Sequence, residues 1–540
     1  MRSLQVLIAD DFEHSRQTIK KMLISLGIDK IDITSTGKGV VDACRAKQYD
    51  LILCDFNLGI GKNGQQALEE VRSTGLLKST GMFVIISAET SRDIVMSIME
   101  ENPDAYLAKP FTSGVLKERI EKLLQQNDEL RDIKEAEDGG NYKRVIALCI
   151  ELINQGSKHS SWCKRKMADT FFSTGQLAKA QSICRSVQET NPVDWAMVIE
   201  AKVMKTKGFI DDAISYLQRA MKLFPSCMQA YDLAVQYFEE KGFFHEAQKI
   251  LQSALRLSPS VVSRQQSLVD ISLSNGDLDT ALKASQQTLR LSVNSVHASA
   301  KQYLQAGQVI SESIFEDDTN ESRKKGQDAF NLLNQVSKKF PNDKATILEK
   351  VLIESRVYSS QGKMSEANDA LKEAQQIIEE QPNILTPDIM LEMGKALYVA
   401  GSIDEADRIF SRVVMENQAN KSLVAKTYAF VDEPVGRTAR AEAKKYNLLG
   451  LALYGEHKYE DALDAFIKAQ NSSPKHPGLN MNLAQTTFKL MADKNSDQGK
   501  KAELVNLCSD SLNRIKHISD KHQQYQRYKS LQNYAARHLK

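Results

Sequence analysis

The sequence LQVLIADD at residues 4–11 and the sequence YDLILCDF at residues 49–56 each contain an apolar run that leads into aspartate. Three further apolar runs, KIDITS, MFVIIS and AYLAK, lie at residues 30–35, 82–87 and 105–109. Amphipathic stretches alternate with these runs, at residues 14–26, 38–47, 65–73 and 91–100 and from residue 114 onward. Short apolar runs that alternate with helical patterns predict a parallel sheet with helices on both faces.

Polar side chains stand where four of these predicted strands end. They are Asp10 and Asp11 after the first, Asp55 after the third, Ser87 after the fourth and Lys109 after the fifth. In open parallel sheets, functional groups gather beyond the carboxyl ends of the strands. We therefore expect these side chains to form one site.

The chemistry of such a site follows from its charges. Neighbouring carboxylates repel one another, and the repulsion raises the pKa of at least one of them unless a cation neutralises it. Oxygen ligands without His or Cys favour a hard ion, so Mg²⁺ is the expected metal. An aspartate can form an acyl phosphate, for which Lys109 and Ser87 would bind the phosphoryl oxygens. The alternative is an acidic surface cluster in which Lys109 only pairs with Asp55.

In this order and at these positions, the residues resemble the receiver domain of bacterial two-component response regulators over residues 4–124. The resemblance implies a flavodoxin-like, five-stranded fold, a histidine kinase as partner and Asp55 as the phosphoacceptor. It implies that Lys109 and Ser87 assist catalysis, and that Mg²⁺ is bound by Asp10, Asp11, Asp55 and the backbone carbonyl of Asn57. It also implies that the domain catalyses its own phosphotransfer and dephosphorylation.

The same resemblance implies a conformational switch. Ser87 would move toward the phosphate and Tyr106 would fill the vacated space, while a cis peptide bond before Pro110 would turn Lys109 into the site. The alternative for Tyr106 is an ordinary surface tyrosine on the last strand. One departure lies in the loop FNLGIGKNG at residues 56–64, where Gly59 replaces the usual proline and Gly64 comes one residue late. No catalytic residue is lost, so we expect a competent site.

The rest of the chain repeats with a period of 33 or 34 residues. The repeat carries a glycine, an alanine five residues later and, in three units, a proline seventeen residues after the glycine: Gly175, Gly208, Gly242 and Gly276; Ala180, Ala213, Ala247 and Ala281; Pro192, Pro225 and Pro259. Small residues at a fixed period of this length indicate paired antiparallel helices. The pattern resembles the tetratricopeptide repeat over most of residues 140–490, which implies an α-solenoid; a generic helical bundle is the alternative. The alanine frame continues at Ala329, Ala367, Ala406 and Ala462.

These patterns divide the chain into a receiver domain at 1–124, a helical linker at 125–139 and a repeat array at 140–540 with a C-terminal capping helix. The frame is interrupted by an acidic segment at 308–324 and by a breaker at 433–436. Insertions in such arrays often form contacts, although a longer helix or a loop without a role is an equal alternative. Residues 511–540 carry seven Lys or Arg against one acid and are interpreted as the cap rather than a contact face for nucleic acid.

Composition excludes several classes of protein. Lys plus Arg is 71 and Asp plus Glu is 69, so nucleic-acid binding, which usually requires a basic excess, is not favoured. No apolar run approaches the length of a spanning helix, so no membrane insertion is expected. Seven scattered cysteines without a CxxC motif indicate reduced thiols in a cytoplasmic protein.

The leading interpretation is therefore a two-component response regulator. Phosphorylation of Asp55 by a histidine kinase would control protein binding in the groove of the repeat array, and no separate output enzyme is expected. An alternative in the same pathway is a phosphate sink or adaptor that modulates a shared kinase or another regulator. A weaker alternative is a nucleic-acid-binding regulator acting through the repeats or the basic tail. The sequence leaves open the kinase, the groove ligand, the sign of control and whether the protein forms a homodimer.

Overall fold

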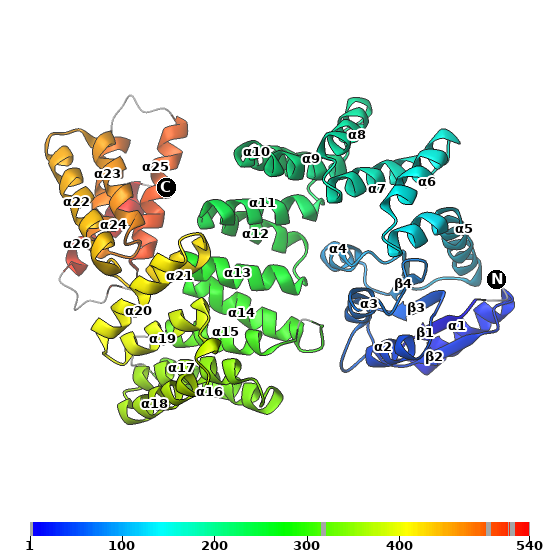
Figure 1. Ribbon diagram of the computed structural model, residues 1–540, viewed down its shortest axis with the longest axis horizontal. Helices are drawn as coiled ribbons and strands as arrows, with labels where there is room; N and C mark the ends of the chain where they lie inside the picture. The colour runs from blue at the N-terminus through cyan, green and yellow to red at the C-terminus, as the bar shows by residue number, and fades with distance from the viewer. Residues whose placement is uncertain are drawn as a thin grey trace. The chain divides into compact units, whose positions relative to one another are not determined.

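The computed structural model describes residues 4–296, 298–314, 320–492, 498–516, 518 and 524–538 (Figure 1). The chain forms two compact units. The first comprises Met1–Phe238, Glu246–Gln265 and Gln287–Ala298, and the second comprises Glu239–His245, Gln266–Gln286 and Ser299–Lys540. Among the described helices, none combines the length and the apolar character needed to cross a bilayer.

The first unit begins with a five-stranded parallel sheet in the order β2-β1-β3-β4-β5. Its strands are β1 Val6–Ala9, β2 Ile31–Thr34, β3 Leu51–Asp55, β4 Met82–Ser87 and β5 Ala105–Ala108. In the register, Ala9 lies opposite Cys54 and Ser87 opposite Ala108, so the carboxyl ends of these strands lie level. This order and direction confirm the predicted flavodoxin-like fold.

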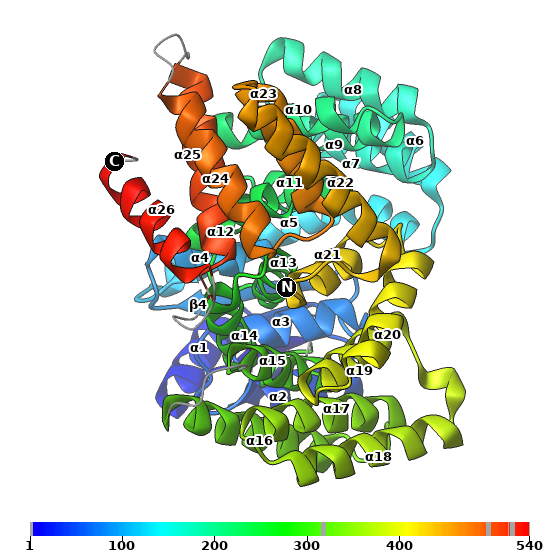
Figure 2. The ribbon, with the colours of Figure 1, turned by 90° about the vertical axis from the view of Figure 1, so that its left-hand side faces the viewer.

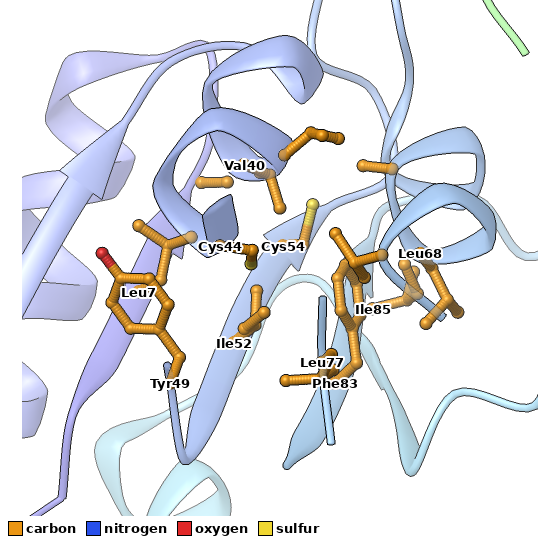
Figure 3. Close-up of a cluster of buried hydrophobic side chains, with 14 of the residues drawn as sticks. Leu7, Val40, Cys44, Tyr49, Ile52, Cys54, Leu68, Leu77, Phe83 and Ile85 are labelled. Carbon is orange, nitrogen blue, oxygen red and sulfur yellow. The ribbon is translucent and has the colours of Figure 1, made fainter. Parts of the chain in front are cut away.

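Two hydrophobic clusters cover the two faces of this sheet. The helices are α1 Glu13–Ser25, α2 Gly37–Ala46, α3 Gly64–Ser73, α4 Arg92–Glu100 and α5 Ser113–Asp138. Alternate strand residues point to opposite faces, so Leu7, Ile52 and Phe83 pack with residues of α2 and α3 (Figure 3). Val6, Leu51 and Val84 instead join Ile19 of α1 and Ile120 of α5. Strands buried on both faces explain why these runs are almost continuously apolar.

Helix α5 is longer than a helix that only covers a sheet. Leu116 and Ile120 in its first half pack on the sheet. Leu130 and Ile133 in its second half join a cluster with Val145 and other residues of the array. The residues that the sequence assigns to a linker are thus helical and contribute to the core of the first array helices.

The remainder of the described chain is helical. The helices that follow the receiver are α6 Tyr142–Asn154, α7 Ser160–Ser173, α8 Leu177–Thr190, α9 Asp194–Thr206, α10 Ile210–Leu223, α11 Met228–Lys241, α12 Phe244–Leu257, α13 Val262–Asn275 and α14 Leu278–Ser292. They are followed by α15 Ala300–Ser313, α16 Asn320–Lys339, α17 Lys344–Ser360, α18 Met364–Glu380, the short 3₁₀ helix η1 Pro382–Ile384, α19 Pro387–Val399, α20 Ile403–Glu416, α21 Lys421–Phe430, α22 Gly436–Gly455, α23 Tyr459–Asn471, α24 Pro477–Met491, α25 Gln498–Arg514 and α26 Tyr525–His538.

The 34-residue pattern corresponds to pairs of packed helices. Consecutive helices contact each other. Examples are α7 with α8 and α9 with α10 in the first unit, and α17 with α18 in the second. The repeat glycines lie in the turns within pairs at positive φ, for example 75° at Gly175 and 90° at Gly208. The repeat alanines, Ala180 among them, are fully buried. Small residues at these points allow close helix approach, as expected for an α-solenoid.

The acidic segment 308–324 is not a uniformly solvated insertion. The side chain of Glu312 on α15 is 9% exposed, and it accepts hydrogen bonds from Lys395 (2.7 Å) and Arg356 (3.3 Å). Burial by itself would raise the pKa of Glu312, but the two cations hold that pKa down at about 2. Residues 316–318 lie outside the described residues. From Asn320 onward the acidic segment belongs to the 20-residue helix α16. A longer helix was one of the alternatives to a contact-forming insertion.

The last helices of the second unit form a common core. Helices α25 and α26 both contact α24 (Figure 2). Tyr528 of α26 is buried in a cluster with Cys508 and Met481, while Tyr525 and Leu531 pack at its edge. The tyrosine and leucine spacing of the basic tail is thus a packing face. All seven cysteines are free and buried.

The helix pairs give a direct test of packing. Replacing Ala180 by Leu should lower the free energy of unfolding by about 1–3 kcal/mol, because extra methylenes would be forced into a filled core. Ala178→Leu, two residues away on an exposed position of α8, should change it by less than about 0.5 kcal/mol. Urea unfolding of both variants measures the difference. Equal effects would contradict the close approach of the helices.

Candidate functional site

The carboxyl ends of β1, β3 and β5 bring together two carboxylates and one ammonium group. Asp10 follows β1, Asp55 ends β3 and Lys109 follows β5. The Nζ atom of Lys109 lies 2.8 Å from Oδ2 of Asp10 and 2.7 Å from Oδ2 of Asp55. Asp10 is 1% exposed and Asp55 is 7% exposed, so the lysine bridges two carboxylates that are largely removed from water.

Asp10 is fixed in place by the start of helix α1. Its Oδ2 accepts a hydrogen bond from Ser15 Oγ at 2.5 Å, and its Oδ1 accepts one from the backbone N–H of Phe12 at 2.9 Å. Arg16 donates to the backbone carbonyl of Asp10 and, at 3.1 Å, to that of Asp11. These hydrogen bonds satisfy both carboxylate oxygens of the buried Asp10 and fix its orientation.

Asp55 is held by opposing electrostatic effects. Burial raises the pKa of its carboxyl above the usual value, the Lys109 ammonium lowers it, and the charge of Asp10 raises it again. The backbone N–H of Asn57 donates to Asp55 Oδ1 at 3.3 Å, and this hydrogen bond is the smallest of the effects that lower the pKa of Asp55. Burial alone would lower the pKa of Lys109, but its hydrogen bonds to Asp10 and Asp55 raise that pKa. Burial is the largest of these effects, so the pKa of Asp55 stays above its usual value despite the contact with Lys109.

The third carboxylate, that of Asp11, has an oxygen atom that accepts no hydrogen bond. One oxygen atom from each of Asp10, Asp11 and Asp55 lies within 4.8 Å of the others. Oδ1 of Asp11 is buried without a hydrogen-bond partner, which is costly unless another group satisfies it. Clustered carboxylate oxygens without nitrogen or sulfur ligands suit a hard divalent cation such as Mg²⁺.

The loop after Asp55 explains the glycines that depart from the receiver pattern. Gly59 and Gly61 have φ values of 70° and 110°, which are available to glycine but not to proline. A Cβ atom added at Gly59 would approach Oδ2 of Asp11 to 3.5 Å, an ordinary van der Waals contact. The backbone at Gly59 therefore has a conformation that proline cannot adopt.

Ser87 and Tyr106 both form hydrogen bonds with the backbone of Glu89, a residue that no sequence pattern indicates. The backbone N–H of Glu89 donates to Ser87 Oγ at 3.0 Å. The hydroxyl of Tyr106 donates to the backbone carbonyl of Glu89. The peptide bond between Lys109 and Pro110 is cis, as the resemblance implies.

The structure thus brings Asp10, Asp11, Asp55 and Lys109 into one cluster and places Ser87 at the end of β4. Sequence reasoning did not identify Ser15, Arg16 or Glu89. Ser15 and Arg16 lie in the first turn of the helix that follows two aspartates, and this position was the available signal for them. Glu89 contributes only backbone groups, which no side-chain pattern can reveal.

The sheet order and the acidic pocket define a receiver-type α/β domain, and comparison with known proteins agrees. The model of the response regulator receiver domain family matches residues 6–121. The chemotaxis protein CheY of Pseudomonas aeruginosa is 31% identical over 123 residues, which are 23% of this chain and 98% of that protein. CheY-3 of Vibrio cholerae is 26% identical over 125 residues, 23% of this chain and 95% of that protein. Through this segment the chain belongs to the response regulator receiver family.

Solved structures show the same partial coverage. The receiver domain of a sensor histidine kinase from Pseudomonas aeruginosa, described with a magnesium ion coordinated in its active site cleft, is 23% identical, with a TM-score of 0.21. The match covers 23% of this chain and 98% of that one. A Francisella response regulator receiver domain is 27% identical, also with a TM-score of 0.21, and covers 23% of this chain and 98% of that one.

The bridging lysine gives a testable electrostatic role. Lys109→Met should raise the pKa of Asp55 further, because the substitution removes the opposite charge that now lowers it. The pKa is measured by a carbon-detected NMR titration of the aspartate carboxyl groups without metal. Lys117→Met, at an exposed position of α5, is the matched control. An unchanged titration in Lys109→Met would show that another group compensates the Asp55 charge.

Proposed function

We propose that the chain is a two-component response regulator that accepts a phosphoryl group on Asp55 from a histidine kinase. The observation that carries this proposal is the pocket itself: Asp55 ends a central strand, contacts Lys109 and lies beside two further aspartates. This is the set of groups that phosphoryl transfer needs, because that reaction is catalysed mainly by positioning and by neutralisation of charge.

The residues of the chain have distinct roles in the proposed reaction. A carboxylate oxygen of Asp55 attacks the phosphorus of a phosphohistidine, the phosphorus–nitrogen bond breaks and an acyl phosphate forms. Lys109 moves its hydrogen bond from the carboxylate to a phosphoryl oxygen, and the Ser87 hydroxyl donates to another. Asp10, Asp11, Asp55 and the carbonyl of Asn57 would hold Mg²⁺, which would supply the remaining positive charge. Water attack on the phosphorus, assisted by the same groups, returns the free aspartate.

We further propose that residues after the receiver form a tetratricopeptide-type output that binds a protein partner. The 34-residue frame, the buried alanines and the close helix approaches support it. A Cβ atom added at Gly394 or Gly450 would lie 2.6 Å from Phe410 or Phe466, so these glycines let paired helices touch. Stacked helix pairs present an extended surface suited to peptide or helix ligands. The buried, free thiols are in keeping with a reducing, cytoplasmic compartment.

Phosphorylation is tested directly. Incubation of the full chain with acetyl phosphate and Mg²⁺ should add one phosphoryl group, detected by intact mass and by a mobility shift in a phosphate-affinity gel. Asp55→Asn should abolish the modification, because it removes the attacking carboxylate. Asp42→Asn, an exposed aspartate on α2, should be modified like the natural chain. Modification that persists in Asp55→Asn would place the acceptor elsewhere.

Metal binding is tested separately. Asp11→Asn should weaken Mg²⁺ binding about tenfold or more, because one charged oxygen ligand becomes neutral. Isothermal titration calorimetry of the natural chain, Asp11→Asn and the control Asp42→Asn gives the comparison. Undiminished Mg²⁺ affinity in Asp11→Asn would remove this carboxylate from the ligand set.

A further inference from the structure

Helix α4 of the receiver has two faces that pack on different partners. Its inner face carries Ile98, buried among the side chains that cover the sheet, with Ile94 at the edge of that cluster. Its other face carries Met96, which packs against Met228 and Tyr231 of the array. The receiver core uses only the isoleucines, so the contact of Met96 belongs to the array alone.

The acidic end of the same helix is held by an arginine of the array. Arg264, at the start of α13, donates to Glu100 through Nη1 at 2.9 Å and Nη2 at 2.5 Å. It also donates to Asp232 of α11, through Nε at 2.6 Å and Nη2 at 2.8 Å. The Arg264 side chain is 5% exposed, so these two carboxylates compensate a positive charge that is largely removed from water.

Glu100 lies at an unfavourable place for a carboxylate within its own helix. The last turn of α4 carries no basic residue, and the partial negative charge of a helix carboxyl end repels an acid. The bidentate contact with Arg264 offsets this repulsion. A helix that needed only to cover the receiver sheet would gain nothing from a glutamate there.

Two further contacts define the shape of the surface. Ser97 and Ser258 are both fully buried, with their hydroxyl oxygens 3.0 Å apart. Beside them, a cavity of about 450 Å³ lies between Met99 of α4 and the array residues Trp195 and Gln229. The array residues Met228, Ser258 and Arg264 thus contact a helix through a methionine, a serine one residue later and a glutamate four residues later.

The loop next to the phosphoacceptor is attached to the same unit. The Nζ atom of Lys62 donates to the backbone carbonyl of Asn294 at 2.5 Å, and Asn294 Nδ2 donates to the carbonyl of Gly61 at 3.0 Å. Gln66 donates to the carbonyl of Leu291 at 3.0 Å. The lengthened glycine loop and α4 therefore both contact the array.

We propose that the array surface around Met228, Asp232 and Arg264 is a binding site for an amphipathic helix with Met, Ser and Glu at relative positions i, i+1 and i+4, and that α4 occupies this site as an internal ligand. This proposal rests on the proposed function, since it names the surface and the partner chemistry of the output. The partner is a protein helix with an acidic residue at the position of Glu100. A lysine there would leave Arg264 buried against a like charge, which provides the discrimination.

The internal ligand also explains how phosphorylation can act. A tethered helix competes at an effective concentration of about millimolar, so an external helix binds well only after α4 has left. The loop at 59–63 follows Asp55, α4 follows the strand that ends at Ser87, and both contact the array, so we expect a change of conformation at the acceptor to alter this competition. By linkage, occupancy of the site by an external helix alters phosphorylation in return.

The experiment uses the full chain and a labelled helical peptide of about 20 residues that carries the Met-Ser-x-x-Glu pattern on an alanine-rich host. Fluorescence anisotropy measures binding to the natural chain and to Glu100→Lys, which breaks the internal contact. Glu100→Lys should bind the peptide about tenfold or more tightly than the natural chain. Glu118→Lys, the same charge change at an exposed position of α5, should behave like the natural chain.

Two further arms test the discrimination. A peptide with Lys in place of Glu should not bind Glu100→Lys, and the double variant Glu100→Lys with Arg264→Ala should lose binding of the original peptide. Phosphorylation of Asp55 by acetyl phosphate in each variant verifies that the receiver is folded. Equal binding of the two peptides, or no gain in a folded Glu100→Lys chain, would overturn the proposal.

A beryllofluoride arm separates this proposal from the proposed function. Beryllofluoride with Mg²⁺ should strengthen peptide binding to the natural chain if phosphorylation displaces α4. Peptide binding that increases in Glu100→Lys but not with beryllofluoride would support the helix site and contradict phosphorylation control. Gain with beryllofluoride but none in the folded Glu100→Lys chain would support phosphorylation control and overturn the site.

Discussion

The contact of Lys109 with Asp10 and Asp55 is the interaction on which the receiver depends. It exists because three parallel strands in register end at the same edge of the sheet, so groups distant in sequence meet within hydrogen-bond distance. The cores on both faces of the sheet fix the strands and leave the side chains at this edge little freedom. Burial raises the pKa of Asp55 above its usual value despite the contact with the lysine. One oxygen from each of Asp10, Asp11 and Asp55 lies within 4.8 Å of the others, an arrangement that suits a hard divalent cation.

The array shows a comparable use of buried charge. Arg356 and Lys395 of the second unit are almost fully buried, and they are matched by Glu312 and Glu392. Removing any one of these groups would leave each of its two partners in a buried site with one opposite charge fewer, which is destabilising. Small residues bring paired helices close together, and this charge cluster joins α15, α17 and α19.

Helix α4 connects these two regions of the first unit. Its isoleucines belong to the core of the sheet, and its methionine and glutamate belong to the array. A helix shared in this way cannot move relative to one partner without changing its contacts with the other. The receiver core and the array surface are thus linked through packed side chains and ionic hydrogen bonds.

The sequence by itself determined the alternation of strands and helices, the residues at the strand ends and the pairing of helices after residue 140. These properties follow from local periodicity and from the rule that parallel strands end together. Only the tertiary structure decided that Ser15 and Arg16 orient the first aspartates, that Glu312 is buried and that Arg264 holds Glu100. Each of these contacts joins residues whose local patterns carry no trace of the partner, because an exposed and a buried charge look alike in sequence. Their burial depends on which surfaces meet, and that is a property of the folded chain.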